Sequence, residues 1–398
     1  MSIATVRRDP VLQSLTLSTI ASAMSLGLTF SVSALYLTRV AGLSAGALGL
    51  GLTLAGLFAT AATFAAGRIC DRYGPRRVMV TAAVTQAAAL VGYCLLGPDV
   101  LVFVGLACIA LGAQGVQRTA QVTLIAQAFT GSGRTEARAR LRVITNALVA
   151  VGSGAGAVAL AIGTAPAYRI ALVTAAVLVL CSALPLARLP VVPAAPPPIA
   201  GGPAPLRDRR YLAVAALNGV IYVQFDVLTV GMPLWVAGHT QAPEALIGVL
   251  LMLNTALVTV FQVPVTRLVT DVRAAGRSVF GATGLLALAC VLYPAAAPFG
   301  AAAGVLVLVI AVAIHSFGEV LSEAGGWELA FELADPARPG AYQGVSQTGA
   351  ALGGALAPLT ITSTAIAHGL PGWLLLGGVF VAAGAGTELV SRPRVRTE

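Results

Sequence analysis

Residues 67–77 read Gly-Arg-Ile-Cys-Asp-Arg-Tyr-Gly-Pro-Arg-Arg, a short basic stretch between two apolar runs that are each long enough to cross a bilayer. Arginines beside hydrocarbon must lie on one defined side of a membrane. A weaker copy follows at 267–277, where Asp271 and Arg277 occupy the places of Asp71 and Arg77. The pattern predicts a membrane protein made of two related halves.

Composition agrees with a chain that lies in lipid. Of 398 residues 58% are hydrophobic and only 10% are charged, and the mean hydropathy is +0.89. The apolar runs are continuous, without the alternation of barrel strands, so we expect an all-α membrane protein with about twelve transmembrane helices in two six-helix halves. The predicted spans are 11–37, 44–66, 78–97, 100–129, 140–163, 168–187, 211–237, 244–266, 278–298, 301–331, 340–366 and 371–389.

The basic residues define the expected topology. The formal charge is +9, there is no lysine, and all arginines except Arg39, Arg118 and Arg169 fall in alternate loops or at the two termini. This distribution follows the positive-inside rule rather than the footprint of a nucleic-acid-binding protein. We therefore expect a multi-pass protein of the bacterial inner membrane with both termini cytoplasmic, whose first span is a retained signal anchor.

A proline-rich segment at 189–210 separates the halves and predicts a cytoplasmic linker, which gives an N-terminal half of 1–188 and a C-terminal half of 211–398. A second echo supports duplication, because Gly152 and Gly156 correspond in spacing to Gly349 and Gly353. Small residues four apart let helices approach closely in lipid. They would suit an interface at which the halves slide, or ordinary helix packing.

The loop predicted after the second span resembles the signature of the major facilitator superfamily, G-x-x-x-D-R-x-G-R-R/K, with Pro75 inserted before the arginine pair. The matching positions are Gly67, Asp71, Arg72, Gly74, Arg76 and Arg77. This resemblance covers essentially the whole chain and implies a secondary transporter. It also implies that the motif is a cytoplasmic gate, which locks the outward-facing state against the start of the eleventh helix near 340–343. The alternative is a purely topological role.

Within that family the chain looks similar to twelve-helix proton-coupled drug and metabolite exporters of actinobacteria. The likeness lies in the lysine-free, arginine-rich composition and in the runs 118–126, 138–146 and 318–334. Two features depart from it. Leu111 stands three residues before Gln114-Gly115, where such exporters often carry arginine, and the antiporter's Gly-Pro signature is missing from 152–156.

Ionisable residues inside apolar spans are costly and are usually kept for a function. Asp226 lies mid-span, with Tyr222 four residues earlier on the same expected face. His315, Glu319 and Glu323 recur every fourth residue, a stripe that would line water and carry protons or bind a cation. Arg118 lies mid-depth among glutamines and needs an anionic partner such as Asp226 or Glu319. The alternative for this set is an interhelical salt bridge that fixes packing.

Other side chains have less specific interpretations. No metal site is predicted, although a His and a Glu four residues apart could share one. Several amides are candidates for cavity lining or helix-to-helix hydrogen bonds, among them Asn218, Gln224, Asn254, Gln262 and Gln347. Phe225, like Tyr222, is expected in a pocket. An interfacial belt is predicted for Tyr36, Trp235, Trp327 and Trp373.

The sequence thus favours a monomeric secondary active transporter, which exports a small amphiphilic or cationic organic compound in exchange for protons. Its partners would be that compound, protons and membrane lipids, with no cofactor beyond the proton gradient and no nucleic acid. No nucleophile triad, two-metal cluster or phosphate-binding loop indicates an enzyme. The alternatives are a proton-coupled uptake symporter and, in another class, a non-transporting lipid sensor.

Overall fold

The computed structural model describes residues 9–189, 205–243 and 246–392, whose regular elements are all helical, with no strand. Twelve helical segments of this described part are long and apolar enough to cross a membrane, so the predicted fold class is confirmed. Large apolar side chains such as Phe30, Leu101 and Met252 are exposed on them, as expected for a surface that faces lipid. The protein is a multi-pass membrane protein.

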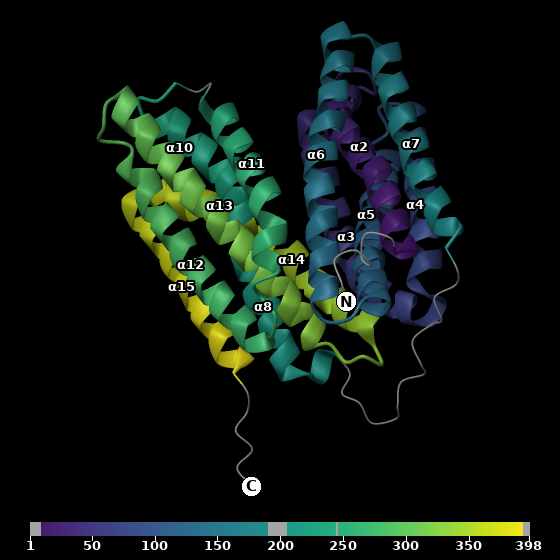
Figure 1. The fold of residues 1–398 in the computed structure, drawn as a ribbon. Helices are drawn as coiled ribbons and strands as arrows, with labels where there is room; N and C mark the ends of the chain where they lie inside the picture. The colour runs from purple at the N-terminus through teal and green to yellow at the C-terminus, as the bar shows by residue number, and fades with distance from the viewer. Residues whose placement is uncertain (1–8, 190–204, 244–245, 393–398) are drawn as a thin grey trace. The chain divides into compact units, whose positions relative to one another are not determined.

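Six segments precede the proline-rich stretch (Figure 1). They are α2 (Pro10–Arg39), α3 (Ala45–Tyr73), α4 (Pro75–Cys94), α5 (Val100–Ala128), α6 (Ser132–Ile162) and α7 (Ala165–Ala187). The predicted starts and ends are close, with two corrections. α3 continues seven residues beyond the predicted end at 66, and α6 begins at Ser132 rather than at 140. Charge therefore marks where the chain leaves hydrocarbon, not where the helix ends.

The seventh segment is broken into α8 (Arg209–Tyr222), α9 (Gln224–Asp226), the π-turn η2 (Val227–Gly231) and α10 (Met232–His239), and a short 3₁₀ turn η1 (Pro205–Arg207) precedes it. Pro233 explains the π-turn, because it has no N–H to donate to the preceding turn and its ring crowds the carbonyl there. The N–H of Met232 bonds instead to the carbonyl of Val227, five residues back.

The remaining five segments complete the twelve. They are α11 (Leu246–Thr266), α12 (Val272–Ala295), α13 (Ala301–Glu332), α14 (Pro339–Ile361) continued by the π-turn η3 (Thr362–Ile366), and α15 (Leu370–Ser391).

The helices form two compact units. The first holds the described residues of Met1–Gly133, Arg140–Gly202 and Asp335–Gly344, and the second those of Arg134–Ala139, Pro203–Ala334 and Val345–Glu398. Residues 190–204, the proline-rich part of the predicted linker, lie outside the described residues, as do Arg7 and Arg8. The predicted limits of the two halves and of their linker stay a prediction.

Packing within the units repeats. In the first unit α3 and α4 both pack on α5, and α7 packs on α2 and α4. In the second, α11 and α12 pack on α13, and α15 packs on α8 and α12 (Figure 1). These are the same pairs six spans later, so the two units share one arrangement of six helices.

The two glycine pairs, Gly152/Gly156 and Gly349/Gly353, belong to this repeat. In the first unit a Cβ on Gly152 would collide with the carbonyl of Met24, so α6 lies directly on α2. In the second, a Cβ on Gly353 would collide with the carbonyl of Gly219, so α14 lies on α8. Both glycines pack helices inside one unit. The predicted sliding interface between halves is wrong for these residues, and ordinary close packing is correct.

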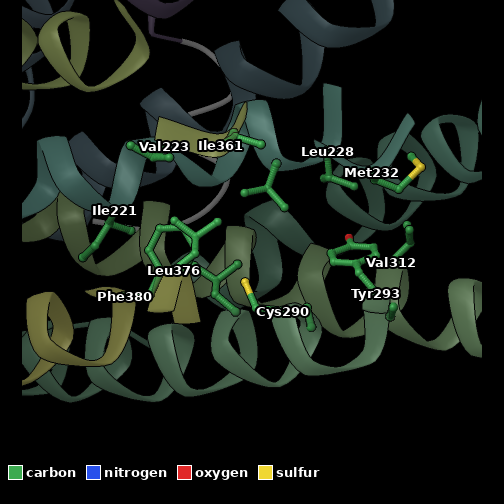
Figure 2. Packing of buried hydrophobic residues seen from close by; sticks show 14 of the residues in the cluster. Ile221, Val223, Leu228, Met232, Cys290, Tyr293, Val312, Ile361, Leu376 and Phe380 are labelled. Carbon is green, nitrogen blue, oxygen red and sulfur yellow. The ribbon is translucent and has the colours of Figure 1, made fainter. Parts of the chain in front are cut away.

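The core of the second unit joins all its helices through aliphatic and aromatic side chains, including Leu228, Met232, Tyr293, Val312 and Phe380 (Figure 2). The predicted interfacial aromatic belt is wrong, because its members are 0–7% exposed and pack inside the units: Tyr36, Trp235, Trp327 and Trp373. Depth in the membrane does not reveal which face of a helix a ring occupies.

Candidate functional site

The signature motif forms a helical corner rather than a loop. α3 runs to Tyr73, Gly74 follows with φ +84°, and Pro75 starts α4. Only glycine adopts that φ without strain, and proline is favoured at the first position of a helix. The inserted Pro75 therefore fits the corner, and Asp71 is held in the last turn of a helix.

Asp71 binds the start of α14 within the first unit. Its Oδ1 accepts from the N–H of Gly340 at 2.7 Å and its Oδ2 from the N–H of Ala341 at 2.8 Å. These N–H groups have no partner within their own helix, and the positive end of the helix dipole favours a carboxylate there. The predicted contact with the start of this helix is present, and its role as a gate stays a prediction.

Glycines make that contact possible. A Cβ on Gly67 would collide with the carbonyl of Gly340, and a Cβ on Gly344 would lie 3.1 Å from both the Cα of Gly67 and the carbonyl oxygen of Phe64. The backbones of α3 and α14 are therefore in contact, which brings Asp71 within hydrogen-bond distance. Gly67 of the motif allows the backbones of α3 and α14 to meet, and it does not form a turn.

The arginines of the motif differ in their contacts. Arg76 donates from Nε to the carbonyl of Leu186 at 2.9 Å and from Nη2 to the carbonyl of Ala187, so it caps the end of α7. Arg72 lies over the ring of Tyr73 at 5.3 Å, and both Arg72 and Arg77 are exposed. Exposed arginines at this position suit anionic lipid headgroups.

The second copy of the motif is not equivalent. Asp271 accepts from the N–H groups of Arg273 and Ala274, both at 2.8 Å, and so caps its own helix α12. Arg267 forms an ion pair with Glu136 at 2.9 Å. The sequence similarity is therefore retained, but Asp271 caps the helix that follows it, α12, and not a helix distant in sequence.

In the second unit, α13 presents the predicted stripe. His315, Glu319 and Glu323 are all buried. Nε2 of His315 lies 2.9 Å from Oε1 of Gln224, and Oε2 of Glu319 accepts from Nδ2 of Asn254 at 2.9 Å. The stripe is thus tied to neighbouring helices by amides, two of the polar residues noted in the sequence.

The end of α13 meets the first turns of α6. Glu328 accepts from the hydroxyl of Thr135, and Glu332 pairs with Arg134 at 3.3 Å. The guanidinium of Arg138 lies over the rings of Trp327 and Phe331, at 5.0 and 5.8 Å. Sequence reasoning placed these α6 residues in a loop and so missed their contacts.

A cleft opens where these elements converge. The cleft is narrow, with a cavity volume of about 20 Å³, and all of its lining belongs to the second unit. The lining mixes one carboxylate and one guanidinium with amides, hydroxyls and three aromatic rings: Arg138, Asn218, Ile221, Tyr222, Gln224, Phe225, Ser322, Glu323, Gly326, Trp327, Ala330, Ser346, Gln347 and Ala350. Such a mixture of apolar walls and few charges is typical of small-molecule sites.

The structure brings some predicted site residues together and not others. Glu323 and Tyr222 line the cleft, and His315 reaches it through Gln224. Asp226 is not among the lining residues and accepts instead from the hydroxyl of Thr229 at 3.4 Å. The break at Val223 explains the separation, because Tyr222 and Asp226 do not share a continuous α-helix.

Arg118 lies on α5 in the first unit. Its side chain is exposed, without a hydrogen bond or ion pair to the described residues. The amides beside it have partners, since Gln117 donates to Gln86 at 2.8 Å and Gln121 to Thr19 at 2.9 Å. A pairing with Asp226 or Glu319 would join the two units and stays a prediction.

Metal ligands do not gather in the described part of the chain, where no three His, Cys, Asp or Glu side chains form a group. His315 and Glu319, the pair that could have shared a metal, each bind a separate amide.

Twelve spans in the described part of the chain, arranged in two units with the same internal packing, are typical of transporters built from repeats. The sequence matches the Major Facilitator Superfamily over residues 15–358, so the chain belongs to that superfamily. No curated protein matches the sequence.

Solved structures agree on the fold. The chain is similar to the human organic anion transporter MFSD10 (TETRAN), with a TM-score of 0.73, 16% identity, and 95% of this chain and 99% of that one covered. It is also similar to the proton:xylose symporter XylE bound to 6-bromo-6-deoxy-D-glucose (TM-score 0.72, 15% identity, 94% of each chain). A bacterial homologue of the iron transporter ferroportin gives a TM-score of 0.72 at 14% identity, with 96% and 98% covered.

Proposed function

We propose that this protein is a proton-coupled exporter of a small amphiphilic organic compound with a cationic group. The observation that supports this proposal is the cleft of the second unit, where the carboxylate of Glu323 lies among Tyr222, Phe225 and Trp327. A carboxylate and aromatic faces are the groups that attract an organic cation.

The coupling residues follow from the same unit. Glu319 and Asp226 exchange protons for substrate, because a carboxylate held away from water is neutral at lower cost than charged. Arg118 biases their protonation, and the motif at 67–77 gates the inner face by releasing and rebinding the start of α14. The protein works by alternating access in a bacterial inner membrane, as a monomer with both termini in the cytoplasm.

A transport assay in proteoliposomes tests this proposal. Ethidium is the cationic probe, and an imposed pH gradient is the driving force. We expect the wild type to accumulate ethidium against its gradient. The variants Glu323→Gln, Glu319→Gln and Asp226→Asn should transport ethidium at least about tenfold more slowly than the wild type. Glu388→Gln is the matched control, since Glu388 lies on α15 outside the cleft and pairs with Arg392 in the described part of the chain. Wild-type rates in Glu323→Gln, Glu319→Gln and Asp226→Asn would refute the assignment.

A second substrate class, an organic anion, is favoured by one observation, the guanidinium of Arg138 in the same cleft. Carboxyfluorescein is the probe for this alternative. Faster movement of carboxyfluorescein than of ethidium, together with its loss in Arg138→Gln, would select the anion. The uptake symporter predicts that probe and proton move in the same direction, and a lipid sensor predicts that neither probe moves.

A further inference from the structure

Among the buried polar groups of the second unit that have no hydrogen-bond partner in the described residues, four belong to side chains that lie close to one another. They are Nδ1 of His315, the hydroxyl of Tyr293 and the indole N–H groups of Trp235 and Trp373. Each of these side chains is 0–5% exposed. A buried polar group without a partner is costly, and in proteins such groups are generally satisfied by ordered water.

These groups are neighbours in an unbroken series. The ring of His239 stacks on Trp235 at 4.0 Å, and Trp235 meets Trp373 edge-on at 5.8 Å. Tyr293 lies 5.3 Å from Trp373 and 6.1 Å from His315, between ring centroids. Figure 2 shows Tyr293 in the core beside Val312.

The two ends of the series differ in environment. His239 is exposed and ends α10, at the opposite end of the seventh span from the arginines at 209 and 210. His315 is bound to Gln224, which lines the cleft. The series therefore runs from an exposed end of the second unit to its polar interior.

We propose that bound water molecules connect Tyr293, Trp373, Trp235 and Nδ1 of His315, and that this chain is a proton path from the end of α10 to the cleft. The proposal rests on the proposed function, because only a proton-coupled transporter requires such a path.

The chemistry of the path is simple. The water next to His315 gives its proton to Nδ1 and receives one from the water behind it, so only O–H and N–H bonds exchange. Nε2–H keeps its hydrogen bond to Oε1 of Gln224 throughout. The imidazolium then gives the Nδ1 proton to a further water, and that water protonates the carboxylate of Glu319, one turn along α13 and one turn before the cleft-lining Glu323. Tyr293 faces the other ionisable neighbours, Cys290 on its own helix and Glu319 across from it.

Water contact at His315 can be measured without a substrate. The chain has only three histidines, His239, His315 and His368, so [¹⁵N]histidine-labelled protein in bilayers gives three resolvable imidazoles. Water-edited solid-state NMR then follows magnetisation transfer from water to each ring. His239→Gln and His368→Gln assign the signals by removing them.

We expect transfer to Nδ1 of His315 on the timescale seen for exposed His239, and a slowing of at least about threefold in Tyr293→Phe. Tyr168→Phe is the matched control, because the hydroxyl of Tyr168 is also buried without a partner among the described residues but lies in the first unit. It should leave His315 unchanged. Absent transfer to His315 in the wild type, or equal transfer in Tyr293→Phe and wild type, would overturn the proposal.

A transport assay with the same protein distinguishes failure of the water chain from failure of the proposed function. If wild-type protein moves no probe while His315 contacts water, the water chain stands and the exporter fails. If the wild type couples ethidium to protons while His315 stays dry, the exporter stands and the path is refuted.

Discussion

At the scale of single residues, the same aspartate makes different contacts in the two copies of the motif. Asp71 lies in the last turn of α3 and caps α14, whereas α11 already ends at Thr266, so Asp271 falls beyond it and caps α12. Helix length therefore decides which N–H groups a matching residue can reach. The sequence match alone could not reveal this difference.

Replacing Asp71 by Asn should weaken the structure, because the neutral amide offers one acceptor oxygen where the carboxylate satisfies two N–H groups and the helix dipole. We expect the free energy of unfolding, measured by thermal denaturation, to fall by about 1 kcal/mol. Asp271→Asn is the control, since Asn and Asp are nearly equal as helix N-caps. Equal losses in the two variants would show that Asp71 has no special role at α14.

At the scale of helices, glycine contacts define which pairs pack. α2 lies on α6 and α8 on α14 because backbone meets backbone at Gly152 and Gly353. The spacing of these glycines predicted close packing correctly but not its partners. Partners depend on helix rotation, and rotation is set by the whole packed unit.

Adding one methyl group tests this packing. Gly353→Ala should destabilise the second unit by about 1–3 kcal/mol, because its Cβ meets backbone that cannot move aside. Gly354→Ala is the neighbouring control, since its Cβ would meet nothing within 4 Å, and it should be neutral or stabilising by about 0.5–1 kcal/mol. Chemical denaturation of the two variants in detergent measures the difference. A stable Gly353→Ala would contradict direct backbone contact.

The seventh span shows another limit of prediction. Hydropathy gives a span of the right length, and an unbroken helix would put Tyr222 and Asp226 on one face. Pro233 and the break at Val223 change the direction in which successive side chains point, and of Tyr222 and Asp226 only Tyr222 lines the cleft. A proline inside a pattern warns of a kink, but the direction of the kink depends on its neighbours.

At the scale of the whole molecule, the fold was predictable because lipid forces each span to be helical and apolar. The lining of the cleft was predictable in part: buried acids are rare enough to notice, so the sequence indicated Glu323, which lines the cleft, together with Glu319, which does not. Arg138 was not, because an arginine near other arginines indicates a loop, and its contact with Trp327 depends on packing between distant helices.

Topology gives a prediction at the same scale. On a cysteine-free background, Gln241→Cys should react with an impermeant maleimide in intact cells, because it lies beyond the end of the seventh span that is distant from the arginines. Arg207→Cys should react only after the cells are opened. The reverse pattern would contradict the predicted orientation.

The most direct test of the account is the direction of coupling. Liposomes containing the protein and a trapped pH indicator would report ethidium and proton movement in the same recording. We expect ethidium and protons to move in opposite directions, reversal of the pH gradient to reverse ethidium movement, and both signals to fall together in Glu323→Gln. Ethidium movement without a pH change, or in the same direction as protons, would contradict proton-coupled export.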